Sequence, residues 1–246
     1  MSGLKSFPAP FDAVVIGASG GIGSALTRAL ATDAGVRRVF AFARSDAAPE
    51  GDKIVRGRID LADEASIAAA AETAQSDALR LVVIAAGMLH TDHQRPEKAL
   101  RDLDATALAA SFAANAIGPA LAIKHFAPLL ARTDKTAIAA LSARVGSISD
   151  NRKGGWYGYR AAKAALNQLV RTSAVELAAK RRDLVCVALH PGTVRTGMSA
   201  PFLDGYTANE IFEPDFAAAA LLRVIDALTP AQTGRVFAWD GAEIAP

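Results

Sequence analysis

The feature that most constrains the fold is a steady alternation of short, largely apolar runs with longer alanine-rich stretches. Parallel strands cannot be joined by tight turns and need crossover helices, so this alternation indicates a parallel sheet. Apolar residues fill most of the runs without a break, as is typical of strands that helices cover on both faces. The predicted strands are 13–16, 38–43, 53–57, 81–85, 136–141, 184–189 and 235–238.

The stretches between these strands have the composition of helices, because alanine is the strongest helix former. No linker, repeat or low-complexity tract interrupts the alternation over the 246 residues. The sequence therefore predicts one domain over residues 1–246, an α/β doubly wound parallel sheet of about seven strands with helices on both faces. The predicted helices are 22–33, 63–75, 99–113, 116–132, 157–181 and 215–228.

Charge and cysteine content exclude several classes of function. A formal net charge of +2 and the lack of any basic run give no sign of a nucleic-acid partner. The single cysteine, Cys186, lies in an apolar run and excludes an internal disulfide. The apolar stretch 81–89 is too short to span a membrane, and residues 1–10 do not form a secretory signal. We expect a soluble, cytoplasmic protein without a membrane or nucleic-acid partner.

A glycine-rich turn follows the first predicted strand: Gly17-Ala18-Ser19-Gly20-Gly21-Ile22-Gly23. Glycines there permit a tight turn, let the backbone approach a pyrophosphate, and direct the amides of a helix N-terminus at the anion. The spacing differs from the commoner Gly-x-Gly-x2-Gly pattern. A methyltransferase or a plain loop could carry such a turn as well.

The end of the second predicted strand indicates which dinucleotide is bound. Folds that use NAD usually place an acid there to hold the ribose hydroxyls, whereas this chain has Arg44. A guanidinium suits a 2′-phosphate, so NADP(H) is the preferred cofactor. Asp46 lies nearby and keeps NAD(H) possible, and Arg44 could also be a solvated loop charge.

Tyr159 and Lys163 are four residues apart and lie on one face of the predicted helix 157–181. A free tyrosine titrates near ~10, and a neighbouring ammonium is expected to lower that pKa. The phenol could then exchange a proton with a substrate oxygen while a cofactor exchanges hydride. By itself this spacing occurs by chance in many helices, where it is an ordinary packed tyrosine beside a surface lysine.

Other polar residues occur at matching places along the chain. Ser142 ends the fifth predicted strand, where its hydroxyl could polarise a carbonyl, and Asn115 lies in the helical region before it. The turn Pro191-Gly192-Thr193-Val194-Arg195-Thr196 follows the sixth strand. In an open parallel sheet ligands bind beyond the carboxyl ends of the strands, so the loops 87–98, 142–156 and 191–214 should wall the site.

Taken together, residues 12–241 resemble the short-chain dehydrogenase/reductase family. The resemblance implies a Rossmann-like fold and a catalytic tetrad of Asn115, Ser142, Tyr159 and Lys163, of which Lys163 also holds the nicotinamide ribose. It further implies a cofactor site that continues from the glycine turn. The implied cofactor-binding residues are Gly17, Ser19, Gly20, Gly21, Ile22, Gly23, Arg44, Asp60, Leu61, Ala86, Gly87, Asn115, Tyr159, Lys163, Pro191, Gly192, Val194 and Thr196.

The seventeen-residue gap between Ser142 and Tyr159 is similar to that of C-factor-like and sniffer-type carbonyl reductases. Ser147 lies closer in sequence to Tyr159, but Ser142 is preferred because it ends the strand. The chain departs from many relatives at Ala85-Ala86, where they carry two asparagines, and we expect altered bracing there.

The sequence thus predicts an NADP(H)-dependent oxidoreductase that transfers hydride between the nicotinamide and a carbonyl or alcohol, acting as a carbonyl reductase. A non-catalytic dinucleotide-binding signalling protein and a methyltransferase are the alternatives. No metal is expected, because His90, Asp92 and His93 lack a convincing further ligand. The long helices of residues 99–132 and 157–181 are the faces that pair subunits in many relatives, which favours a homodimer or homotetramer.

Overall fold

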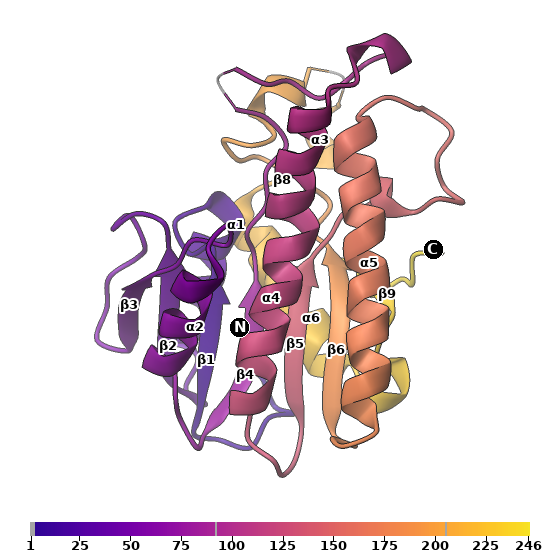
Figure 1. Cartoon of the computed structure of the whole chain (residues 1–246). Coiled ribbons are helices and arrows are strands. Elements are labelled where there is room, and N and C mark those ends of the chain that lie inside the picture. The colour runs from indigo at the N-terminus through magenta and orange to yellow at the C-terminus, as the bar shows by residue number, and fades with distance from the viewer. Residues whose placement is uncertain (1–2, 92, 205) are drawn as a thin grey trace.

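Seven strands form one parallel sheet in the computed structural model, which describes residues 3–91, 93–204 and 206–246. Their order across the sheet is β3-β2-β1-β4-β5-β6-β9 (Figure 1). The predicted doubly wound α/β fold is confirmed. The bounds are β1 Phe11–Ile16, β2 Val36–Ala43, β3 Ile54–Arg58, β4 Leu79–Ile84, β5 Thr136–Leu141, β6 Leu184–His190 and β9 Val236–Ala238.

Helices cover both faces of this sheet. Successive strand residues point to opposite faces, so Ala13 and Val15 of β1 pack beneath α1 and α6, while Val14 and Ile16 pack beneath α2, α4 and α5. Because both faces are buried, the central strands are apolar at most of their positions, whereas the edge strand β3 is largely exposed. The helices are α1 Gly21–Thr32, α2 Glu64–Thr73, α3 Ala105–Phe112, α4 Gly118–Phe126, α5 Tyr157–Ala178 and α6 Pro214–Ala227.

The sheet leaves a crevice where its strand order reverses. β1 pairs with β2 on one side and with β4 on the other, so the chain crosses over between β3 and β4. The connections that follow β1 and β4 therefore diverge to opposite faces and open a space beyond the carboxyl ends of the strands. The loops after β4, β5 and β6 gather at this end, at the top of Figure 1.

Two local predictions are wrong. The helix expected at 99–113 begins only at Ala105, because Leu100–Asp102 forms a separate 3₁₀ turn and Asp104 caps the new helix through the amide of Ala107. The expected break after residue 113 is instead a π-helical turn, Ala113–Ile117, that runs on into α4. A small parallel ladder of β7 Thr193–Val194 and β8 Ile211–Phe212 was not predicted at all.

The joined helical segment Ala105–Leu129 is, by length and composition alone, apolar enough to cross a membrane, with a mean hydropathy of 1.5. The expectation that no such segment exists considered only uninterrupted apolar runs. In the fold, α4 packs against α2 and α5, and the buried Asn115 of the same segment bonds to the loop after β4. We therefore assign it to the helical layer that covers the sheet.

Candidate active site

A cleft of about 900 Å³ opens beyond the carboxyl ends of β5 and β6. Its walls come from the loops after these two strands, from the start of α5 and from the segment that leads to β8. Ser142, Tyr159, Pro191 and Thr196 all line it, as does Ile22 at the start of α1. Residues separated by more than a hundred positions in the sequence thus meet in one cavity.

The glycine-rich turn has the shape of a phosphate cradle. Gly17 adopts a left-handed φ of 89°, and a Cβ there would lie 2.9 Å from the backbone of Ala85. A Cβ on Gly23 would collide with the carbonyl oxygen of Gly17. Helix α1 then begins at Gly21 without a side-chain cap on its first amides. Backbone amides at an uncapped helix start bind anions, so the turn fits the pyrophosphate of a dinucleotide.

The turn after β6 closes on the same helix start. A Cβ on Gly21 would lie 2.7 Å from Cγ2 of Thr196, so the two segments touch. Val194 is buried and held in the β7–β8 ladder, and Gly192 adopts a φ of 81° beside the ring of Phe212. This packing fixes the Pro-Gly turn at the edge of the cleft, next to the phosphate cradle.

Arg44 lies exposed at the end of β2. Its backbone carbonyl accepts a hydrogen bond of 2.9 Å from Nη2 of Arg58 at the end of β3, so the guanidinium of Arg58 lies beside the backbone of Arg44. Asp60 is exposed and Leu61 is half-buried where the chain leaves β3. Sequence reasoning missed Arg58, although its register partner Ala43 directly precedes Arg44.

Tyr159 and Lys163 lie one turn apart near the start of α5. Nζ of Lys163 is 5.7 Å from the centroid of the Tyr159 ring and donates a 2.8 Å hydrogen bond to the carbonyl of Leu141. Lys163 is 2% exposed. The amine is therefore buried between the end of β5 and the tyrosine, where the low dielectric strengthens its electrostatic interaction with neighbouring groups.

Asn115 is fully buried in the π-helical turn and faces the loop after β4. Its Oδ1 accepts the amide of Met88 at 2.9 Å, and its Nδ2 donates to the Met88 carbonyl at 2.7 Å. Single π turns inside α-helices are frequent at functional sites. A Cβ on the neighbouring Gly87 would lie 3.1 Å from this Oδ1 and 3.5 Å from Nζ of Lys163, so Asn115 and Lys163 meet at Gly87. Ala86, just before it, is half-buried.

Of the two candidate serines, only Ser142 is among the residues that line the cleft. Its Oγ donates a 2.7 Å hydrogen bond to Oδ1 of Asn167, whereas Oγ of Ser147 accepts the amide of Asp150. Asn167 is a residue that sequence reasoning missed. The signal was the spacing, because Tyr159, Lys163 and Asn167 recur every four residues and so share one helix face.

Burial controls the protonation of the tyrosine and the lysine. It raises the pKa of Tyr159 to about 12 and lowers the pKa of Lys163 to about 8. The pKa of the phenol therefore lies above its ordinary value, not below it as the sequence predicted, because desolvation penalises the phenolate. The phenol keeps its proton at neutral pH, which suits a proton donor.

Glu97, in the loop after β4, holds the start of α5. Its carboxylate is 7% exposed and its Oε2 accepts the amide of Gly158 at 3.2 Å, while its backbone carbonyl accepts the amide of Trp156. A carboxylate is stabilised at a helix N-terminus by the amides and the helix dipole. Trp156 has a φ of 53°, a strained value for a bulky residue. The bonds from Glu97 to the amides of Trp156 and Gly158 hold the backbone in this conformation.

We expect Glu97→Ala to lower kcat by about tenfold and to destabilise the fold by about 1–3 kcal/mol, because it leaves the buried amide of Gly158 without an acceptor next to Tyr159. Steady-state kinetics and thermal unfolding check both effects. Glu97→Gln keeps an acceptor oxygen and should retain most of the rate. A Glu97→Ala enzyme with an unchanged kcat would contradict this positioning role.

Within the described residues, no group of three His, Cys, Asp or Glu side chains could hold a metal ion. Asp92, which lies between His90 and His93 in the sequence, is outside the described residues. Cys186 is fully buried, and burial raises the pKa of its thiol to about 12. A buried thiol of that pKa is inert.

Comparison with known proteins gives the family. Residues 12–206 match the model described as short chain dehydrogenase. The chain is 37% identical to the C-signal of Myxococcus xanthus over 59% of this chain and 82% of that protein. It is 32% identical to 1-hydroxy-2-glutathionyl-2-methyl-3-butene dehydrogenase of Rhodococcus sp. (strain AD45), over 93% of this chain and 96% of that protein.

Solved structures agree in fold. The NADPH-bound carbonyl reductase from chicken fatty liver superposes with a TM-score of 0.83 at 25% identity, covering 99% of this chain and 97% of its own. The carbonyl reductase Sniffer of D. melanogaster gives the same TM-score of 0.83 at 23% identity, over 97% of this chain and 100% of its own. The matched relatives, the fold and the cleft together show that this chain is a member of the short-chain dehydrogenase family.

Proposed function

We propose that this protein is an NADP(H)-dependent carbonyl reductase, which transfers hydride between the nicotinamide and a small carbonyl or alcohol. The observation that carries the proposal is that Ser142 and Tyr159 line one cleft together with Ile22 and Thr196 of the phosphate cradle, and that Lys163 lies beside the ring of Tyr159. A proton donor and a dinucleotide site on one cavity are the parts that carbonyl reduction requires.

In the proposed mechanism the bound cofactor supplies or accepts hydride, and the protein manages the oxygen of the substrate. On substrate binding, the hydroxyl of Ser142 exchanges its hydrogen bond to Oδ1 of Asn167 for one to the substrate carbonyl, which it polarises. Tyr159, protonated at neutral pH, delivers its proton to the oxygen as negative charge develops there. The ammonium of Lys163 stabilises the phenolate that is left, and Asn115 holds the backbone of Met88 beside Gly87.

The preference for NADP(H) is supported by Arg44 after β2, where an NAD site would carry an acid, and by the guanidinium of Arg58 at the end of β3 beside it. The NADPH-bound state of the chicken carbonyl reductase agrees with it. We expect Arg44→Asp to weaken NADPH binding by about tenfold or more and to leave NADH binding within about twofold, because a carboxylate repels the 2′-phosphate.

Fluorescence titration of both cofactors measures this effect. Arg182→Asp is the matched control, since Arg182 is also exposed but precedes β6 at the opposite end of the sheet. It should change neither affinity. An equal loss of NADPH and NADH binding in Arg44→Asp would contradict the assignment of Arg44 to the 2′-phosphate.

Turnover of a panel of aldehydes, ketones and quinones, followed through NADPH oxidation, tests the proposed function. Similarity to the C-signal gives weight to a signalling protein as the second candidate. NADPH binding without turnover of any carbonyl, together with a biological effect that survives Tyr159→Phe, would favour that candidate. Tighter binding of S-adenosylmethionine than of NADPH in a thermal-shift comparison would favour a methyltransferase.

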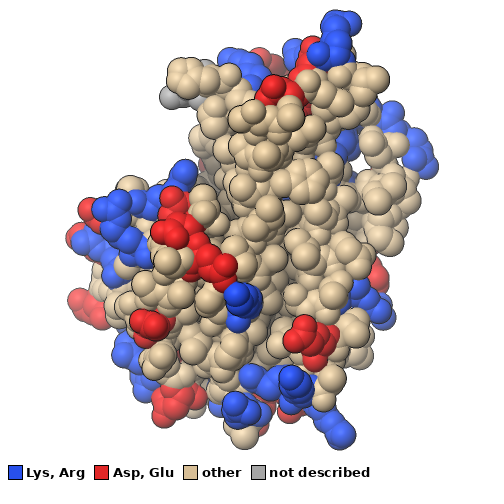
Figure 2. All heavy atoms as spheres, viewed as in Figure 1, with Lys and Arg blue, Asp and Glu red and all other residues tan. Residues whose placement is uncertain are grey.

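We also propose that two copies pair through the outer faces of α4 and α5. Figure 2 shows few charged side chains over these helices; Leu169 and Val175 of α5 are 37% and 59% exposed, and Ile117, just before α4, is 52% exposed. Apolar side chains gathered on one face favour a protein contact. Light scattering should give a multiple of 25.5 kDa, and Val175→Lys should reduce it towards the monomer. A monomer in the unaltered protein would contradict this pairing.

A further inference from the structure

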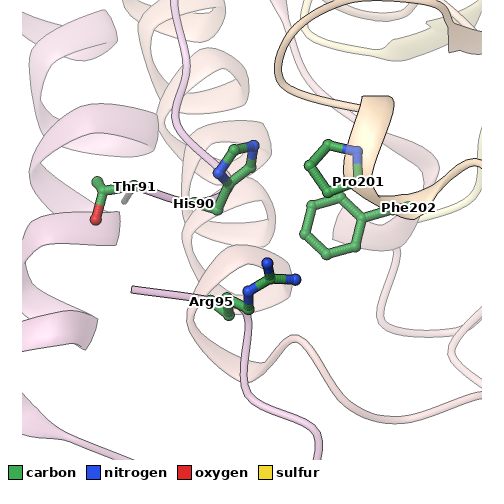
Figure 3. Close-up of a pocket in the computed structure, with 5 residues that line it drawn as sticks. All are labelled: His90, Thr91, Arg95, Pro201 and Phe202. Carbon is green, nitrogen blue, oxygen red and sulfur yellow. The ribbon is translucent and has the colours of Figure 1, made fainter. Parts of the chain in front are cut away.

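A second pocket, of about 230 Å³, lies beside the cleft. The loop after β4 contributes His90, Thr91 and Arg95 to its lining, and the 3₁₀ turn Ala200–Phe202 contributes Pro201 and Phe202. Figure 3 shows His90 and Arg95 facing the two residues of that turn across the pocket. Its walls therefore combine a flat apolar side with a guanidinium and an imidazole.

Phe202 lines both this pocket and the main cleft, so it forms a shared wall between them. A row of aromatic contacts joins the two. The rings of Tyr159 and Trp156 pack edge-on with their centroids 6.3 Å apart. The centroids of Trp156 and Phe202 are 5.3 Å apart, and those of Phe202 and His90 are 5.6 Å apart. An elongated apolar molecule with its carbonyl at Tyr159 could follow these rings past Phe202.

The charges on this path favour an anion at its far end. Arg95 is the charged residue among the described residues that line the second pocket, and no carboxylate lines it there. Along the main cleft, four lysine or arginine residues face two acids: Arg144, Arg152, Lys153 and Arg160 against Asp150 and Glu210. A positive excess in a walled cleft concentrates anionic ligands.

We propose that the pocket of His90, Arg95 and Phe202 is a subsite for the carboxylate end of an elongated aromatic or apolar carbonyl substrate. The proposal rests on the carbonyl reductase function and names its substrate class. Arg95 pairs with the carboxylate through its planar fork, which matches carboxylate geometry, and Phe202 and Trp156 pack against the body of the substrate.

The test compares a para-formylated biphenyl carboxylic acid with its methyl ester. Calorimetry gives the Kd of each for the intact protein, and NADPH oxidation gives kcat/KM. We expect the acid to have a Kd about tenfold lower and a kcat/KM about tenfold higher than the ester, because a charge-assisted hydrogen bond is lost in the ester. The shorter para-formylbenzoate and its ester should differ less, since the shorter acid does not pass Phe202.

Two exposed arginines give matched variants. Arg95→Glu should remove the preference for the acid and leave the ester within about twofold. Arg101→Glu, in the same loop and outside both pockets, should keep the preference. Circular dichroism confirms that each variant folds.

Equal binding of acid and ester, or a preference that survives Arg95→Glu, would overturn the subsite. A preference lost in Lys153→Glu but kept in Arg95→Glu would overturn it too, because the anion would then lie in the main cleft. Preference for the acid in binding without NADPH oxidation would leave the subsite standing and refute the reductase function.

Discussion

Tyr159→Phe is expected to lower kcat for carbonyl reduction by about 10²–10⁴-fold while leaving the Kd for NADPH within about twofold. The hydroxyl is the proposed proton donor, and burial keeps it protonated, with a pKa raised to about 12. Phenylalanine preserves the ring that packs against Trp156, so the wall of the cleft remains. Initial rates and a fluorescence titration of NADPH separate the loss of chemistry from a loss of binding.

Tyr157 offers a matched control for this substitution. It is in the same first turn of α5, but 36% of it is exposed and it does not line the cleft. Tyr157→Phe should therefore retain the rate of the unaltered enzyme. A Tyr159→Phe enzyme with more than about a tenth of the original kcat would show that another group supplies the proton.

Lys163→Met should lower kcat by about 10²-fold or more, because it removes the charge that stabilises the phenolate. The pH dependence identifies the same group. Burial lowers the pKa of Lys163 to about 8, so the ammonium is present below that pH and is lost above it. We therefore expect the rate of carbonyl reduction to fall as the pH rises through about 8, and Lys163→Met to be slow without that fall.

Lys135 is the matched control for the lysine. Burial also lowers its pKa to about 8, but it bonds to the carbonyls of Ile225 and Asp226, at the other end of β5 from Ser142. Lys135→Met should leave the pH profile of kcat unchanged. If it abolished the alkaline fall, or if Lys163→Met kept it, the profile would not report the ammonium of Lys163.

Most of the architecture could be predicted from the sequence because helices cover both faces of the sheet. That covering makes the strand Thr136–Leu141 apolar after its first residue, and the predicted bounds of this strand match the structure. The small ladder of β7 and β8 could not be predicted, because a strand of two residues is too short to show a hydrophobic pattern. The start of α3 at Ala105 could not be predicted, because its N-cap, Asp104, lies inside a stretch whose composition is helical throughout.

Part of the candidate site could also be predicted from the sequence, and part could not. The neighbourhood of Tyr159 and Lys163 follows from helical spacing, and the position of Ser142 follows from the end of a strand. The protonation of the tyrosine does not follow from spacing, because burial by distant segments sets its pKa. Glu97 could not be predicted either, since it bonds across sixty-one positions of sequence to the start of α5.

The fate of a label tests the central claim most directly. Reduction of an aldehyde or ketone with NADPH deuterated at C4 of the nicotinamide, on either face, is followed by mass spectrometry of the alcohol. We predict that one of the two labelled cofactors places a single deuterium on the carbinol carbon, and that Tyr159→Phe suppresses the product. No deuterium in the alcohol from either cofactor would contradict hydride transfer to a carbonyl in this cleft.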